Sequence, residues 1–354
     1  MDVFAASPWS AHPFDRAVLY KAKSQTGARG EMTFPCLPSL KAVFFQQLQE
    51  LLGALAQNFT AEEWQKLEAL LYRKIDQGFA ASPHARIQFR FDPPDLTQGL
   101  TNGFRMALDL QVPSIEEKYQ RWTKTRPGAL FGTYPDAKAL EVLAALTGNR
   151  PPAEIHVLDI GAGPGRNTLP LAAKGYAVTA IELAPVFVEQ LQQNLAQANL
   201  RAEVVLGNVL SPQTEIWPAR YELVLVSEVV PHFRSYDEVR QLLCRLCDAL
   251  VPGGELLVGG FAAEAGYEPS PLVQEMAQVA WSFFLTAADW ERVWADLPLT
   301  LVEQVPVLPY EKAYVPAEHW PPTPWFENWA SGRDIFPTLN TPPVSLQWFR
   351  WRRL

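Results

Sequence analysis

Residues 155–168 read Ile-His-Val-Leu-Asp-Ile-Gly-Ala-Gly-Pro-Gly-Arg-Asn-Thr, and the rest of the chain is best understood around them. The first six residues are mostly apolar and partly β-branched, which is typical of a buried parallel strand. Gly161, Gly163 and Gly165 follow at alternate positions, and residues 167–174 then predict a helix. A strand, a glycine turn and a helix N-terminus together bring backbone N–H groups against a polar or anionic ligand.

The spacing of the glycines distinguishes between two classes of ligand. The dinucleotide fingerprint G-x-G-x-x-G/A, counted from Gly161, needs glycine or alanine where this chain has Arg166. What remains is D-x-G-x-G-x-G over residues 159–165, and this pattern closely resembles the first motif of the class I S-adenosylmethionine-dependent methyltransferases. The resemblance implies that the loop holds the methionine part of that cofactor. The alternative is a strand-to-helix turn in some other α/β protein.

Composition narrows the class of protein further. The 354 residues are 48% hydrophobic and 19% charged, as in an ordinary globular protein, and can carry one large domain or a core domain with an extension. The net charge of −8 disfavours the large basic surface of a nucleic-acid-binding protein.

The net charge thus predicts no nucleic-acid partner, and three further features predict a cytoplasmic protein that does not bind a membrane. Residues 1–10 lack the pattern of a signal peptide. No stretch reaches the roughly 18 apolar residues of a membrane helix. Three cysteines, a low and odd number, indicate a reducing compartment.

Residues 1–150 are predicted to form a mainly helical extension. Residues 87–91 alternate between apolar and polar and predict one short strand, and residues 148–152 mark the boundary with the next domain. The expected helices cover residues 39–57, residues 60–78 behind a capping box at Thr60 and Glu63, residues 114–122 behind a second capping box, and residues 136–146.

From residue 151 to 354 strands alternate with helices, which predicts an α/β, Rossmann-like fold with a seven-stranded, mostly parallel sheet and helices on both faces. The methyltransferase resemblance covers this part, and implies that the last two strands form an antiparallel hairpin. The expected strands cover residues 155–160, 178–183, 202–209, 221–227, 255–259, 300–308 and 345–352, and the expected helices residues 185–198, 239–250 and 272–294.

Two strand ends supply further candidates for the cofactor site. Glu182 ends the second strand, where a carboxylate can accept hydrogen bonds from both ribose hydroxyls; the alternative is a cap for the helix near Pro185. Similar methyltransferases often have Asp at the position of Asn208, where it accepts a hydrogen bond from the adenine amino group. The amide oxygen of Asn208 can make the same bond, and the N–H of Val209 can meet a ring nitrogen, but an ordinary turn asparagine is the alternative.

The resemblance thus implies a cofactor site drawn from the glycine loop and the ends of the neighbouring strands. Its members are Asp159, Gly161, Ala162, Gly163, Gly165, Glu182, Leu183, Asn208, Val209 and Glu228.

Glu228 and His232 are the candidates for acid–base catalysis, because both follow the fourth strand at the same sheet edge. His232 as a helix-capping or core residue is the alternative, and many methyltransferases need no base, because alignment and desolvation carry the reaction. The segment lacks the Asn/Asp-Pro-Pro-aromatic tetrapeptide of many amide and base N-methyltransferases, which disfavours amide-nitrogen and exocyclic-amine acceptors.

Three other features have both a functional and a structural interpretation. Residues 309–344 are rich in proline and aromatic residues and either line an acceptor pocket or partner surface, or cover the sheet edge. Cys244 and Cys247 have C-x-x-C spacing without a second pair, so we interpret them as core residues and predict no metal site. A basic cluster either binds the cofactor carboxylate or an acidic acceptor, or is a solvated helix face; it comprises Lys118, Arg121, Lys124 and Arg126.

These observations predict an S-adenosylmethionine-dependent methyltransferase that modifies an oxygen or nitrogen of an unidentified acceptor, with residues 1–150 as a cap on the acceptor side. The acceptor is either a small molecule in a closed pocket or a protein on an open docking face. The overall layout resembles the cyanobacterial enzymes that methylate an asparagine of phycobiliproteins. A non-catalytic cofactor-binding module is a third alternative.

Overall fold

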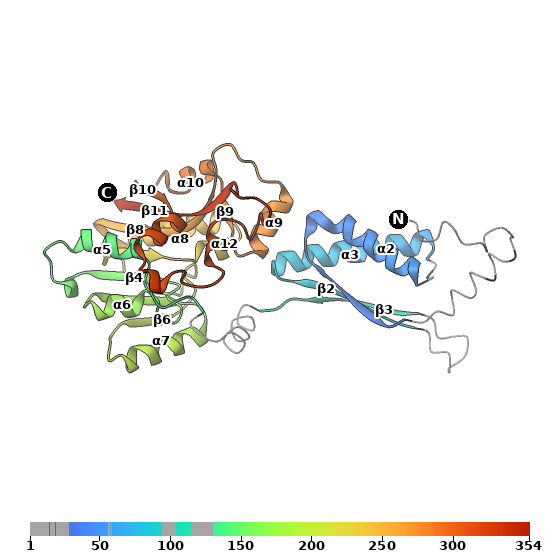
Figure 1. The fold of residues 1–354 in the computed structure, drawn as a ribbon, viewed down its shortest axis with the longest axis horizontal. Helices are drawn as coiled ribbons and strands as arrows, with labels where there is room; N and C mark the ends of the chain where they lie inside the picture. The colour runs from blue at the N-terminus through green and yellow to red at the C-terminus, as the bar shows by residue number, and fades with distance from the viewer. Residues whose placement is uncertain are drawn as a thin grey trace. The chain divides into compact units, whose positions relative to one another are not determined.

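The computed structural model describes residues 28–55, 57, 59–93, 104–114 and 130–354, together with Phe14 and Val18. The chain divides into two compact units, residues 1–113 and 114–354 (Figure 1). This division precedes the boundary expected at residues 148–152, because helix α5 (Ala137–Thr147) packs within the second unit. The basic cluster and the helix expected after Ser114 lie outside the described residues.

The first unit is a three-stranded antiparallel sheet, in the order β1-β2-β3, with two helices on one face. Along the middle strand Ile87, Phe89 and Phe91 are buried and the residues between them are more exposed, so the predicted strand is confirmed. The two flanking strands were not predicted. The elements are β1 (Gly30–Pro35), α2 (Lys41–Ala54), α3 (Ala61–Ala81), β2 (Arg86–Asp92) and β3 (Arg105–Gln111).

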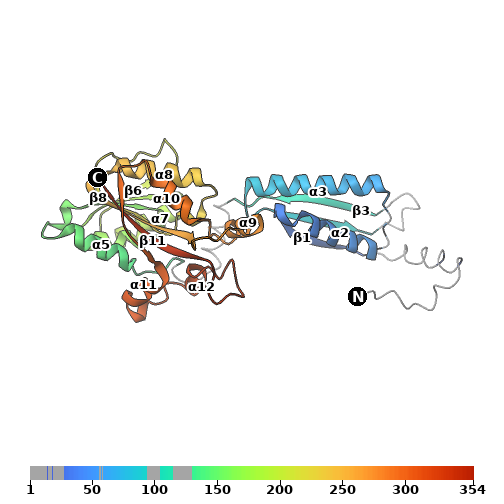
Figure 2. The same cartoon turned by 90° about the horizontal axis from the view of Figure 1, so that it is seen from above.

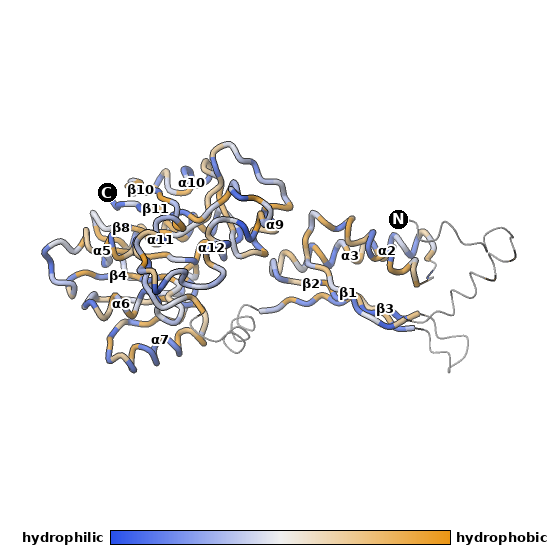
Figure 3. The backbone as a smooth tube through the Cα atoms, viewed as in Figure 1, coloured by the Kyte–Doolittle hydropathy of each residue, from blue (hydrophilic) through white to orange (hydrophobic). Residues whose placement is uncertain are grey.

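Helix α3 begins at the predicted capping box, where the N–H of Glu63 donates to Thr60 Oγ1 at 3.3 Å. Hydrophobic and hydrophilic residues alternate along it in Figure 3, and its apolar side is buried. The helix was expected to end at Gly78 but continues to Ala81. Gly78 serves packing instead, because a Cβ there would lie 2.4 Å from the sulfur of Cys36.

The second unit contains the predicted sheet, in the strand order β10-β11-β8-β7-β4-β5-β6. Strands β4 to β8 are parallel, and β11 is antiparallel to both β8 and β10, which confirms the terminal hairpin. A short extra strand, β9 (Phe284–Leu285), pairs with the end of β8. The main strands are β4 (His156–Ile160), β5 (Ala177–Glu182), β6 (Glu203–Leu206), β7 (Tyr221–Val226), β8 (Leu250–Ala263), β10 (Leu299–Pro306) and β11 (Val344–Arg353).

Helices cover both faces of this sheet, as predicted. Figure 2 shows α8 and α10 on one face and α5, α11 and α12 on the other, and each set forms its own buried apolar cluster with the strands. The helices are α6 (Thr168–Ala173), α7 (Pro185–Gln197), α8 (Tyr236–Ala249), α9 (Pro271–Val279), α10 (Ala287–Trp294), α11 (Val307–Tyr314) and α12 (Phe326–Ala330). No helix in the described parts of the chain is both long and apolar enough to cross a membrane.

The aromatic insertion at residues 309–344 is not simply an extended loop, because it contains most of α11 and all of α12. Its residues Phe326 and Trp329 are buried in the same apolar cluster as Phe261 of β8, and Trp329 meets the ring of Phe261 edge to face at 5.1 Å between centroids. These aromatic side chains therefore cover one face of the sheet.

A buried ion pair joins the terminal hairpin to the parallel part of the sheet. Glu255 of β8 is fully buried, and its carboxylate accepts hydrogen bonds from Arg350 Nε at 2.6 Å and from Arg352 Nη2 at 2.7 Å. Both arginines belong to β11. Since a buried carboxylate needs a counter-charge, this pairing favours the observed register of β11 against β8.

We therefore expect Glu255→Gln to lower the free energy of unfolding by about 3 kcal/mol, because the part-buried Arg350 loses its nearest carboxylate partner and keeps only the longer contact to Glu303 at 3.8 Å. Urea denaturation at pH 7 measures the change. The matched control is Asp296→Asn, which removes a well-exposed partner of Arg240 in the same unit and should have little effect. Equal effects of the two substitutions would show that the buried pair adds nothing.

Candidate functional site

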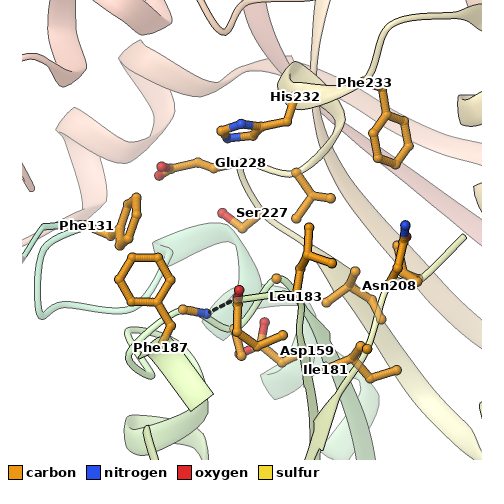
Figure 4. A pocket seen from close by; sticks show the side chains of 18 of the residues that line it. Phe131, Asp159, Ile181, Leu183, Phe187, Asn208, Ser227, Glu228, His232 and Phe233 are labelled. Carbon is orange, nitrogen blue, oxygen red and sulfur yellow. Dashed lines mark hydrogen bonds between the residues drawn. The ribbon is translucent and has the colours of Figure 1, made fainter. Parts of the chain in front are cut away.

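The carboxyl ends of β4, β5, β6 and β7 open onto a cavity of about 340 Å³ (Figure 4). The loops that follow these strands form most of its lining, together with Phe131 and Trp281. Ligands of open parallel sheets bind at this edge, because the loops after successive strands diverge there and leave a crevice.

The glycine loop forms one wall of the cavity. Gly161 has φ +70°, and a Cβ on it would lie 2.3 Å from Cγ2 of Val229, so no larger residue fits there without displacing that side chain. Gly163 has φ +54°, and its N–H donates to a carboxylate oxygen of Glu182 at 2.9 Å. The loop after β4 is thereby tied to the end of β5.

Glu182 is 7% exposed and lines the cavity. Its second oxygen accepts a hydrogen bond from the N–H of Ala184 at 2.7 Å. Ala184, and not Glu182, is the N-cap of α7, so the capping alternative is wrong in that form. Burial raises the pKa of Glu182, and the backbone hydrogen bonds oppose that rise. A carboxylate has about four acceptor positions, so both oxygens can accept further hydrogen bonds from a ligand.

Asn208 and Val209 also line the cavity, next to the half-exposed Leu183. The amide oxygen of Asn208 accepts a hydrogen bond from the N–H of Leu210 at 2.9 Å, which is the turn geometry considered as the alternative. That oxygen keeps a second lone pair, so the turn and an adenine contact are compatible.

Asp159 lies at the end of β4, beneath the glycine loop, and is 2% exposed. It accepts a hydrogen bond from the hydroxyl of Thr168, in the first turn of α6, at 2.7 Å. Burial raises the pKa of Asp159 to about 7 in spite of this hydrogen bond.

A buried cation, Arg166, was not among the predicted site residues. It donates to Asp136 at 2.8 Å, to Glu228 at 2.8 Å and to the hydroxyl of Ser227 at 3.0 Å. Burial disfavours its charge, but the nearby carboxylates, Asp136 and Glu228 foremost, outweigh this effect and raise its pKa above the ordinary value. Asp136 is fixed in turn by Asn167, whose amide nitrogen donates to it at 2.9 Å.

The sequence held only a weak signal for this cluster. In the sequence Arg166 is only a departure from the dinucleotide pattern, and Asp136 lies in the segment expected to form the helical extension. Asp136 is the residue that precedes α5, yet its side chain does not cap that helix. It pairs with a residue 30 positions away, and no local pattern reports such a pair.

Glu228 and His232 both line the cavity, as predicted from their strand end (Figure 4). Glu228 has φ +58°, in the left-handed region that non-glycine residues rarely adopt. Burial raises its pKa, and its ion pair with Arg166 opposes the rise. His232 belongs to the short 3₁₀ helix η4 (Val230–His232), and its ring meets Trp281 edge to face at 4.3 Å between centroids.

The structure thus brings all predicted site residues to one cavity except Gly165, whose Cβ position lies 2.7 Å from Leu191 of α7 and so serves packing. Among the cavity-lining residues that the structure describes, none comes from residues 309–344. Cys244 and Cys247 lie on α8, the latter 2% exposed in the core. No group of three or more potential metal ligands occurs within the described ranges. The lining residues that sequence analysis missed include Phe131, Arg166, Arg234 and Trp281.

Comparison with known proteins gives an independent result. A family model described as a methyltransferase domain matches residues 157–254. The ubiquinone biosynthesis O-methyltransferase of Rickettsia akari (strain Hartford) is 26% identical over 110 residues, which cover 31% of this chain and 41% of the relative. That of Rickettsia felis is 24% identical over 106 residues, 30% of this chain and again 41% of the relative. The chain thus matches less than half the length of these relatives.

Solved structures to which this chain is similar include a geranyl diphosphate C-methyltransferase from Streptomyces coelicolor A3(2), with a TM-score of 0.48 and 12% identity over 64% of this chain and 88% of that one. A putative sarcosine dimethylglycine methyltransferase from Galdieria sulphuraria has a TM-score of 0.49 and 17% identity over 67% of this chain and 97% of that one.

The family match begins in β4, spans the glycine loop and the ends of β5, β6 and β7, and stops in β8. It therefore contains most of the cavity described above. Residues 157–254 thus match a methyltransferase domain, which supports the resemblance to the class I S-adenosylmethionine-dependent methyltransferases.

Proposed function

We propose that this chain transfers a methyl group from S-adenosylmethionine to an oxygen or nitrogen atom of a small-molecule acceptor. The observation that carries the proposal is the tie between Gly163 and Glu182, which sets a buried carboxylate beside a glycine turn within the family-matched segment. The two named relatives, both O-methyltransferases of ubiquinone biosynthesis, support an oxygen acceptor.

The residues present fit the cofactor. The turn at Gly161 and Gly163 exposes backbone groups to the cavity, where they can contact the cofactor. Glu182 offers acceptors for the ribose hydroxyls. Asn208 and Val209 line the part of the cavity that we assign to adenine. When bound, the cofactor supplies a methyl group activated by its sulfonium.

The Arg166–Glu228 ion pair suits the amino-acid end of the cofactor. Both side chains line the cavity beside the glycine loop, and together they offer one cationic and one anionic group. The free α-amino and α-carboxylate groups of a methionine moiety carry the complementary charges. The guanidinium of Arg166 also donates to Asp136, and this second contact fixes the orientation of the Arg166–Glu228 pair.

His232 is the better of the two acid–base candidates. The carboxylate of Glu228 already accepts a hydrogen bond from Arg166, whereas an imidazole can take up a proton near neutral pH. In this scheme the acceptor atom would form its bond to the methyl carbon with its own electron pair, while the carbon–sulfur bond breaks and its electron pair stays on the sulfur of the leaving S-adenosylhomocysteine. The proton that the acceptor loses would pass to His232.

We expect Glu182→Gln to weaken the binding of S-adenosylhomocysteine by about 10- to 100-fold, because a charged acceptor for the ribose hydroxyls is lost. Isothermal titration calorimetry measures the affinity. Glu203→Gln, on neighbouring β6 outside the cavity lining, is the matched control and should leave the affinity unchanged. Unchanged affinity in Glu182→Gln would remove the ribose role.

Asp159 predicts a pH dependence of stability. Its pKa rises from 3.8 to about 7, so the folded protein binds this proton more tightly than the unfolded chain. Its contribution to stability is full below about pH 4 and is lost as the pH rises through 7. Asn does not ionise, so the Asp159→Asn variant does not lose this contribution as the pH rises. The Tm of the variant minus that of the wild type should therefore increase from pH 4 to pH 8.

The expected difference at pH 8 corresponds to about 1–3 kcal/mol. Thermal melts in matched buffers test it, with the exposed Asp296→Asn as the control that should show no such trend. A Tm difference independent of pH would mean that Asp159 does not titrate in this range.

Tritiated S-adenosylmethionine, added to the protein with fractionated cell extract, tests the methyl transfer itself. We expect the label in the small-molecule fraction, and about 100-fold slower labelling by His232→Gln because the general base is lost. The affinity of that variant for S-adenosylhomocysteine should be unchanged. Label on a polypeptide would instead support the protein acceptor, and no labelled product would support a non-catalytic module.

A further inference from the structure

Two residues with strained backbones face the same cavity. Within the described ranges, four non-glycine residues adopt positive φ, and two of them, Glu228 at +58° and Trp281 at +54°, line the cavity. The left-handed conformation costs free energy for any residue with a Cβ, so it persists only where the surroundings enforce it. Glu228 is held by Arg166. The left-handed backbone of Trp281 needs a comparable support.

Trp281 occupies a position that usually belongs to glycine. Helix α9 ends just before it, and the N–H of Ser282 donates to the carbonyl of Ala277 at 2.8 Å. This bond is the six-to-one hydrogen bond of a Schellman motif, in which the residue before the donor is left-handed and is commonly glycine. A glycine would end the helix without strain, so helix termination does not explain the tryptophan.

The strained turn is fixed from two sides. The indole N–H of Trp329, in the aromatic insertion, donates to the carbonyl oxygen of Trp281 at 2.9 Å. The N–H of Phe283 donates to the carbonyl of Pro231 at 3.1 Å, which ties the turn to η4. Trp329 is itself 4% exposed and packs against Phe261 of the sheet, so it is a rigid support.

As a result, an aromatic wall stands on one side of the cavity. The rings of Trp281 and His232 meet at 4.3 Å between centroids and 70° between planes. His232 ends η4 and Trp281 follows α9, whereas the cradle proposed for the adenosyl part of the cofactor lies at the ends of β4, β5 and β6. The wall therefore adjoins the part of the cavity that the cofactor would leave to the acceptor.

We propose that Trp281 is a specificity-determining residue that selects planar aromatic acceptors, and that Trp329 positions it. This inference rests on the proposed methyltransferase function. Aromatic rings interact favourably with one another beyond the apolar area that they bury, and a saturated ring of the same size lacks that gain. The aromatic insertion, which does not reach the cavity lining within the described residues, then acts on it through Trp329.

Matched pairs of neutral fragments test the selectivity: phenol against cyclohexanol, and benzamide against cyclohexanecarboxamide. Their dissociation constants are measured by ligand-observed NMR on protein saturated with S-adenosylhomocysteine. We expect each aromatic fragment to bind about three- to tenfold more tightly than its saturated partner. Equal binding within both pairs would overturn the inference.

Three variants locate the effect. Trp281→Leu should abolish the preference and Trp281→Phe should retain it, because only the second keeps an aromatic ring. Trp329→Phe keeps the packing but removes the N–H donor, and should reduce the preference without changing the affinity for S-adenosylhomocysteine. Trp217→Leu, at a tryptophan that is 47% exposed outside the cavity lining, is the matched control and should bind as the wild type does.

The outcomes separate the two proposals. If the wild type fails to bind S-adenosylhomocysteine, the proposed function fails. If it binds but Trp281→Leu keeps the full preference, only the role of Trp281 fails. If Trp329→Phe matches the wild type while Trp281→Leu loses the preference, the positioning role of Trp329 fails. Thermal melts of each variant confirm that it is folded before binding is compared.

Discussion

The hydrogen bond from the N–H of Gly163 to Glu182 is the interaction on which the rest of the site depends. It joins the loop after β4 to the end of β5, and so fixes two walls of the cavity against each other. It forms only because the loop can take left-handed backbone angles and because Gly161 leaves room for the side chain of Val229. The carboxylate remains buried at the cavity because backbone donors compensate part of its desolvation.

A second constraint is electrostatic and reaches further along the chain. Arg166 is buried between Asp136 and Glu228, and so joins the segment before α5, the end of the glycine loop and the end of β7. A buried charge is tolerated only with partners, and here each partner lies on a different element. The cluster therefore holds three elements in one arrangement at the same time as it presents charge to the cavity.

The cavity lining also carries backbone strain, at Glu228 within the charge cluster and at Trp281 outside it. Glu228 and Trp281 both adopt left-handed angles, and each is held by a hydrogen bond or ion pair from another element. Well-packed supports such as Trp329 make this arrangement stable. The aromatic insertion thus combines two tasks, since it covers a face of the sheet and supports a residue of the cavity wall.

The sequence by itself determined the α/β fold of the second unit and nearly all of the cofactor-site candidates. Strand periodicity, the glycine spacing and the acids at strand ends are local features that follow from short-range sterics. Only the tertiary structure decided that β1 and β3 are strands, because their short segments gain strand structure through pairing with β2. It likewise decided the partners of Arg166 and the left-handed turn at Trp281. Those depend on residues tens of positions away, whose proximity arises only when the sheet has assembled.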